Sequence, residues 1–242
     1  MRKYLFLLAA ALLCGGCSCS SKSETEEKAE DQPVQKDIPM KEVQVGSKTY
    51  NVADIDDQMA LYKENVDRDN CFIVISKKEY RLYVYEVAGQ DTLLVAHFPV
   101  CYGKNPGPKQ GTGDMSTPEC TMDEPFCISE IKDASTWCHD FGDGRGQILS
   151  YGAYFMRLVT PGFSGIGIHG STNNEASVPG RDSEGCIRLR DNDLLRLHDL
   201  YAEVDMPVVI KGIKENKLPF EVKAEQKLGD QYKAPKDGNP IK

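Results

Sequence analysis

The stretch SEGCIRL, Ser183 to Leu189, decides both the fold and the chemistry that this sequence predicts. In it a cysteine follows a glycine, with a serine three positions before and an arginine two positions after the cysteine. Cys186 could be a packed thiol, a disulfide partner, a metal ligand or a nucleophile. Free cysteine is usually buried, but the polar neighbours of Cys186 and its position between a glycine-bearing loop and a predicted helix favour a reactive thiol.

Metal binding does not fit the spacing of the other candidate ligands. A structural zinc site uses paired cysteine or histidine ligands a few residues apart. Here Cys120, Cys127 and the pair Cys138–His139 are separated by gaps of six and ten residues. We therefore expect no metal ion, and the thiol chemistry that the family resemblance described below implies needs no organic cofactor.

A nucleophilic cysteine needs a base, and the chain has four histidines. His97 interrupts an apolar strand and His198 lies in a helical pattern, so we expect both to be structural or exposed, whereas the role of His139 stays open. His169 ends the strand GIGIHG, whose glycines let other segments approach. The loop between His169 and Cys186, 17 positions apart, can return the thiol to the imidazole.

The first residues resemble a bacterial lipoprotein signal. Arg2 and Lys3 precede the apolar run YLFLLAAALL and the segment CGGC, which predicts a signal over 1–17 with lipid on the thiol of Cys17. A plain secretory signal is the alternative. The polar, acidic residues 18–40 are predicted to be a flexible tether. We expect an exported protein anchored by lipid to the cell envelope, facing the periplasm.

The rest of the chain is predicted to be mostly β with a few helices, an α+β fold. Residues 41–70 read as a short hairpin followed by a helix over 54–66, because apolar residues there recur at helical spacing. Several strands follow residue 71, and 191–204 is a helical pattern capped by Asp191 or Asn192. Residues 212–242 are predicted to be a peripheral extension. The net charge of -8 argues against nucleic acid as a partner.

GIGIHG followed by SEGCIRL resembles the L,D-transpeptidase catalytic domain, the YkuD-type family of bacterial wall cross-linking enzymes. The shared pattern is His, a loop, and Ser-x-Gly-Cys-x-Arg, and STPE at 116–119 is similar to the family's Thr-Pro-x-Gly turn. The resemblance covers 71–211 and implies a β-sandwich catalytic domain. The sequence departs from the pattern at Glu184, where the family often has histidine, and at Cys120, where the turn has glycine.

The resemblance implies acyl transfer on peptidoglycan stem peptides, from a tetrapeptide donor through a thioester on Cys186, with His169 as base. The N–H groups of Gly185 and Cys186 are the candidate oxyanion hole. Arg188 would hold a substrate carboxylate or brace the loop, and Ser183 would orient His169 or shape the turn. The alternatives are an L,D-carboxypeptidase or endopeptidase that uses the same thioester, and a non-catalytic wall-binding module.

The remaining cysteines and Glu184 also yield expectations. A disulfide between Cys120 and Cys127 suits an exported protein, with buried free thiols as the alternative. We expect the thiols other than Cys186 to be buried, and the Cys186 thiol to react readily near neutral pH. Glu184 should point away from Cys186, because a like charge in contact with the thiolate would weaken the nucleophile.

The variant Cys17→Ala tests the predicted anchor. Without a thiol at position 17 no lipid can be attached, so the variant should move to the soluble fraction or remain uncleaved. Membrane fractionation and the intact mass measure this. An unmodified mature terminus elsewhere in the unaltered protein would contradict the prediction.

Overall fold

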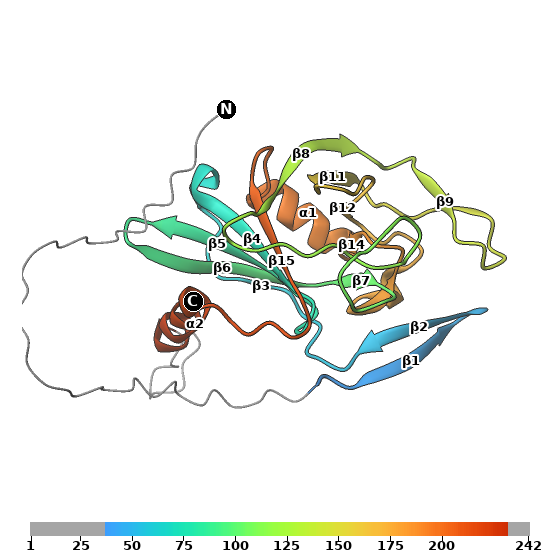
Figure 1. Ribbon diagram of the computed structural model, residues 1–242, viewed down its shortest axis with the longest axis horizontal. Helices are drawn as coiled ribbons and strands as arrows, with labels where there is room; N and C mark the ends of the chain where they lie inside the picture. Colours follow the sequence, from blue (N-terminus) through green and yellow to red (C-terminus); the bar gives the residue numbers. More distant parts are fainter. Residues whose placement is uncertain (1–36, 232–242) are drawn as a thin grey trace, which may run out of the picture. The chain divides into compact units, whose positions relative to one another are not determined.

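The computed structural model describes residues 37–231 of the chain (Figure 1). The predicted signal over 1–17, with Cys17, and most of the predicted tether over 18–40 lie outside the described residues, as do residues 232–242. Within the described range, no helix is long and apolar enough to cross a membrane.

The described residues form a mostly β fold with two α-helices, which confirms the predicted fold class. The strands are β1 (Met40–Val45), β2 (Lys48–Ala53), β3 (Ala60–Leu61), β4 (Cys71–Ser76), β5 (Arg81–Ala88), β6 (Asp91–Pro99), β7 (Cys101–Gly103), β8 (Phe126–Asp133), β9 (Cys138–Asp140), β10 (Gln147–Leu149), β11 (Tyr154–Val159), β12 (Gly167–His169), β13 (Gly180–Ser183), β14 (Ile187–Arg188) and β15 (Pro207–Lys211). The helices are α1 (Asp191–Leu200) and α2 (Pro219–Gln231), with short 3-10 turns η1 (Arg68–Asn70) and η2 (Glu175–Ser177).

Thirteen strands join in one sheet in the order β1-β2-β13-β7-β14-β12-β11-β8-β15-β4-β5-β6-β3, while β9 and β10 pair separately. Helix α1 packs between two parts of this sheet (Figure 1). His198 of α1 stacks on Tyr154 of β11, with ring centroids 3.7 Å apart. At the same end of the helix, the C-cap residue Tyr201 meets Phe98 of β6 edge to face. The sheet thus wraps around α1, which gives the sandwich-like arrangement its core.

The central strand β4 has both faces buried, as expected for a near-continuous apolar run. Ile73 and Ile75 face the main core, which contains Leu194 and Leu197 of α1. Alternate residues of the strand, Phe72 and Val74, face a second cluster on the opposite side of the sheet. Each face of β4 therefore needs its own cover.

Helix α2 supplies the second cover, which the prediction of a merely peripheral extension missed. Phe220, Ala224 and Leu228, spaced four apart along one stripe of α2, pack on this second cluster. Glu221 lies 2.5 Å from Lys211 of β15, and both side chains are almost completely buried. Most of the other residues of α2 are polar or charged, so these three apolar positions alone do not give a clear helical pattern in the sequence.

The predicted helix over 54–66 is wrong. The segment is extended and includes β3, which pairs with the outer strand β6. The N–H groups of Tyr62 and Lys63 both donate to the carbonyl of Val95 on β6. An exposed sheet edge offers backbone partners to an adjacent segment, and here that pairing prevails over the helical spacing of the side chains.

Helix α1 confirms the helical pattern after residue 190, but its predicted cap is wrong. Arg190 occupies the N-cap position and its own side chain makes no cap hydrogen bond, whereas the Glu175 carboxylate accepts from the Asp191 N–H at 2.9 Å. The carboxylate of Asp191 instead accepts hydrogen bonds from the Ser171 N–H and the Thr172 hydroxyl. Asp191 thereby ties the start of α1 to the loop that follows His169.

The buried pair Lys211–Glu221 should contribute more to stability than the pairs on the surface. Glu221→Ala leaves the Lys211 ammonium buried without its partner, so the free energy of unfolding should fall by about 3 kcal/mol. The control Glu225→Ala breaks the more exposed pair with Lys217 and should cost at most about 1 kcal/mol. Urea titration of both variants measures the difference, and equal small losses would contradict the prediction.

Candidate active site

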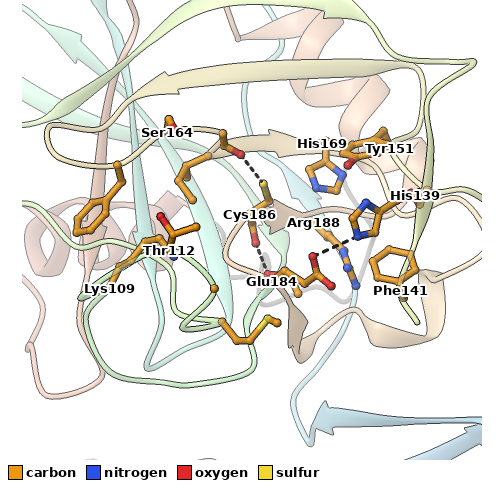
Figure 2. Close-up of a pocket in the computed structure, with 17 residues that line it drawn as sticks. Lys109, Thr112, His139, Phe141, Tyr151, Ser164, His169, Glu184, Cys186 and Arg188 are labelled. Carbon is orange, nitrogen blue, oxygen red and sulfur yellow. Dashed lines mark hydrogen bonds and ion pairs between the residues drawn. The ribbon is translucent and has the colours of Figure 1, made fainter. Parts of the chain in front are cut away.

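The pairing of β12 with β14 brings the two predicted catalytic residues together. The strands run parallel, with Ile168 opposite Ile187 and His169 opposite Arg188. Both isoleucines are fully buried in the main core. Because side chains alternate along a strand, His169 and Arg188 must face the other side of the sheet. Cys186, two residues before Arg188, faces that same side. These residues line one pocket of about 370 Å³ (Figure 2).

The STPE segment braces the loop that carries Cys186. The Thr117 hydroxyl donates to the Gly185 carbonyl at 2.8 Å and accepts from the Gly103 N–H at 3.0 Å. Gly185 has a φ of +133°, and a Cβ there would lie 2.9 Å from the Ser116 carbonyl oxygen. Glycine is therefore required at 185 both for its backbone conformation and for this close approach. Cys120, the departure from the family turn, leaves these contacts in place.

A buried lysine holds the same segment from below. Lys77 is fully buried, and its ammonium donates to the Thr117 carbonyl at 2.6 Å, to Glu119 at 2.8 Å and to the Gly107 carbonyl at 3.2 Å. Desolvation lowers the pKa of Lys77, and Glu119 opposes that shift. A buried ammonium with three oxygen partners fixes the loop geometry, because moving any of them would leave a charge unsatisfied.

Ser183 shapes the turn and does not contact His169, so the expectation that it orients the imidazole is wrong. Its hydroxyl donates to the Cys186 carbonyl at 2.6 Å and accepts from the Gly185 N–H at 3.1 Å. The Gly185 N–H is therefore already engaged in this structure, which argues against its predicted place in an oxyanion hole. The Cys186 N–H remains as the candidate donor.

His169 is held as a neutral base with a defined tautomer. It is 4% exposed, and Nδ1 lies 2.7 Å from the Gly170 carbonyl oxygen. A carbonyl only accepts, so Nδ1 carries the proton and Nε2 is left with its lone pair. Phe155 stacks on the ring and Tyr151 packs at 4.8 Å between centroids. Burial, and then the charge of Arg188, lower the pKa of His169 to about 3.

Cys186 is half-buried, and its thiol donates to the Gly165 carbonyl at 3.3 Å (Figure 2). Burial raises the pKa of this thiol; the Gly167 N–H and Arg188 lower it, and Glu184 adds to the rise. With His169 also uncharged, the resting pair is a neutral thiol and a neutral imidazole. The expected reactivity of Cys186 near neutral pH therefore depends on transfer of the thiol proton to His169.

Arg188 braces the loop. It is 3% exposed, and Nη1 donates to the Asp182 carbonyl at 3.3 Å and lies 3.9 Å from the Asp182 carboxylate. Phe141 covers the guanidinium at 5.1 Å. Of the two predicted roles, the structure thus shows the loop contact, while the guanidinium still borders the pocket.

Sequence reasoning missed two groups that border the pocket. The hairpin of β9 and β10 brings in His139, whose Nε2 lies 3.2 Å from the Glu184 carboxylate (Figure 2). Glu184 is thus directed to His139 and not to the thiol, as expected. On the other side, Lys109 is held by Asp114 at 2.7 Å. The cluster of Trp137 with His139 beside a glycine-rich loop was the signal available in the sequence.

The other cysteines do not behave uniformly. Among the described residues all six cysteines are free, so Cys120 and Cys127 form no disulfide. Cys71 and Cys101 are buried, as expected, and burial raises the pKa of Cys71 to about 12. Cys138 is exposed, which contradicts the expectation that it is buried. No cluster of three potential metal ligands occurs in the described part of the chain.

Comparison with known proteins connects this site to one family. Residues 71–210 match the family model described as L,D-transpeptidase catalytic domain, whereas no curated protein matches the chain. Similar solved structures include Bd1075 from Bdellovibrio bacteriovorus (22% identity, 71% of this chain and 59% of that chain, TM-score 0.44). Another is the helical cell shape determining protein Pgp2 from Campylobacter jejuni (19% identity, 64% of this chain and 51% of that chain, TM-score 0.42). A third is an L,D-transpeptidase from Mycobacterium smegmatis (17% identity, 59% of this chain and 59% of that chain, TM-score 0.43). The chain spans 51% to 59% of the length of these three proteins.

The neutral resting pair predicts how alkylation of Cys186 depends on pH. In a Cys138→Ser background, the iodoacetamide rate should rise about tenfold per pH unit from pH 6 to 9, without a step near 6.5, because His169 stays neutral and the raised thiol pKa lies above this range. Peptide mapping by mass spectrometry measures the rate at Cys186. A rate that is already constant between pH 6 and 8 would reveal a thiolate–imidazolium pair and contradict the prediction.

Proposed function

Because the chain belongs to the L,D-transpeptidase catalytic domain family, we propose that it is a cysteine-dependent L,D-transpeptidase that cross-links peptidoglycan stem peptides. One observation carries the proposal: the parallel register of β12 and β14 turns His169 and Cys186 into the same pocket. A nucleophile, an oriented base and the Cys186 N–H as candidate oxyanion donor are the parts that acyl transfer requires.

In the first half-reaction the Cys186 thiol attacks the amide carbonyl that precedes the terminal D-alanine of a tetrapeptide. Nε2 of His169 takes the thiol proton as the C–S bond forms, and the Cys186 N–H donates to the developing oxyanion. The thiol must first turn from the Gly165 carbonyl, and catalytic hydrogen bonds often tighten only when substrate binds. His169 then gives the proton to the departing amine, and the thioester remains.

In the second half-reaction an acceptor amine attacks the thioester, the C–S bond breaks, and the thiol recovers its proton. Water in place of the amine would give a carboxypeptidase from the same intermediate. Lys109 and Arg188 border the pocket as cations that suit the carboxylates of a stem peptide. Phe141 and Phe163 supply apolar walls for its aliphatic parts.

The proposal also places the enzyme at the cell envelope. Lipid on Cys17 would anchor it to the membrane with its catalytic domain facing the periplasm, and the acidic stretch over 18–40 would let that domain reach the adjacent wall. This part of the proposal rests on the sequence pattern, and the Cys17→Ala variant described above tests it.

Two variants test the chemistry. Cys186→Ala should abolish both product formation from defined muropeptides and the covalent adduct of a carbapenem, whose strained ring opens on acylation. His169→Ala should slow acylation by about 10² to 10⁴, with partial recovery at high pH, where thiolate forms without a base. Product masses and peptide mapping of the adduct are the measurements.

The matched control is Cys138→Ser, which removes an exposed thiol outside the pocket and should leave product formation and the adduct unchanged. A carbapenem adduct on another cysteine, with Cys186 unmodified, would defeat the assignment of the nucleophile. Release of D-alanine without any cross-linked product would favour the carboxypeptidase.

A further inference from the structure

The pocket has two arms of different chemistry on either side of Cys186 (Figure 2). On one side is Lys109, whose ammonium lies 5.9 Å from the centre of the Phe163 ring, and on the other are His139 and Glu184. Within the described part of the chain, Glu184 is the one carboxylate that lines the pocket. The arm around Glu184 is therefore suited to a cationic group of a substrate.

The cations that border the pocket already have carboxylate partners of their own. Lys109 is paired with Asp114 at 2.7 Å, and Arg188 lies 3.9 Å from Asp182. The charge of Glu184 is thus not taken up by either of them. The Glu184 carboxylate instead lies 3.2 Å from the imidazole of His139, which carries a charge only when it is protonated.

We propose that Glu184 and His139 form the acceptor subsite, which binds the ammonium group of a primary amine and converts it to the nucleophile. The inference rests on the proposed function, because an acceptor is needed only if Cys186 carries an acyl group. It adds to that function an explanation of why the thioester would react with an amine in preference to water, and it assigns this selectivity to Glu184 and His139.

The proton balance of the second half-reaction explains why a separate group is needed. The acceptor arrives as an ammonium ion and must lose one proton before its nitrogen can attack the thioester carbonyl. His139 takes that proton while Glu184 stabilises the imidazolium that forms. As the C–N bond forms and the C–S bond breaks, the second proton passes through His169 to the Cys186 sulfur. His139 finally releases its proton to solvent.

The two histidines differ in the way that these roles require. His169 is buried, with 4% of its surface exposed, so it is not placed to pass a proton to solvent. The side chains of His139 and Glu184 are 33% and 38% exposed, so an acceptor can reach them and protons can leave to water. Tyr151 is a neighbour of both imidazoles, with its ring centroid 6.4 Å from that of His139 and 4.8 Å from that of His169. The proposed acceptor subsite and the catalytic base thus share an aromatic neighbour.

Phe141 holds the subsite in place from the outside. Its ring meets His139 edge to face at 4.5 Å and covers the guanidinium of Arg188. The turn behind it is tied down by Arg145, which donates to Asn174 at 2.9 Å and pairs with Asp143. These contacts fix the hairpin that carries His139 against the loop that carries Cys186.

The experiment compares two acceptors with the full chain acylated by a tetrapeptide donor. N-acetylcadaverine is protonated at neutral pH, whereas methoxyamine is uncharged and needs no prior proton loss. For each variant, mass spectrometry gives the ratio of amide product to hydrolysed donor, which cancels any change in the rate of acylation. With N-acetylcadaverine the ratio should fall about fivefold in Glu184→Gln, which removes one partly exposed charge. It should fall about a hundredfold in His139→Gln, which removes the base.

With methoxyamine the ratio should change by less than about twofold in both variants, since no ammonium is bound or deprotonated. The control Glu42→Gln, at an exposed position on β1, should leave both ratios unchanged. Equal losses with both amines would show that the pair only maintains the shape of the pocket and would overturn the inference. Unchanged ratios, or an unaltered chain that only hydrolyses the donor, would overturn it as well.

The same reactions separate this inference from the function on which it rests. If the unaltered chain forms no acyl adduct on Cys186 and releases no D-alanine, the proposed function itself fails. If the adduct forms and D-alanine is released but the ratios do not respond to position 184 or 139, only the acceptor subsite fails.

Discussion

The parallel pairing of β12 with β14 is the constraint on which the site depends. Burial of Ile168 and Ile187 on one face leaves no choice for their neighbours, because a strand alternates its side chains and a shift by one residue would exchange the faces. His169, Cys186 and Arg188 consequently point into the pocket. The apolar core thus positions the reactive groups without contacting any substrate.

The same burial sets the charges of the site. An imidazole with its pKa at about 3 and a thiol with a raised pKa form no ion pair in the resting state, so the proposed acyl transfer requires the thiol proton to move as the sulfur attacks. Removal from water disfavours both charged forms, and nearby Arg188 further disfavours imidazolium while favouring thiolate. His139 and Glu184 differ from the buried His169, because their side chains are partly exposed and can exchange protons with water.

Much of the fold could be predicted because local patterns and tertiary packing agree there. The alternating and continuous apolar runs of β4 and β5, the hairpin of β1 and β2, and the amphipathic α1 all follow from side-chain periodicity. The segment over 54–66 and helix α2 could not be predicted, because each is decided by a partner far away in the chain. One pairs with the open edge of β6, and the other covers the second face of β4 and pairs Glu221 with Lys211.

For the site, the sequence by itself identified the candidate nucleophile and the candidate base, because His169 and Cys186 stand in short motifs whose spacing carries chemical meaning. Only the tertiary structure decided that Ser183 closes the turn, that the thiol rests protonated, and that His139 meets Glu184, 45 positions away in the chain. The physical reason is that protonation states and long-range contacts depend on burial and on the packing of separate strands. Neither of these is a property of neighbouring residues in the sequence.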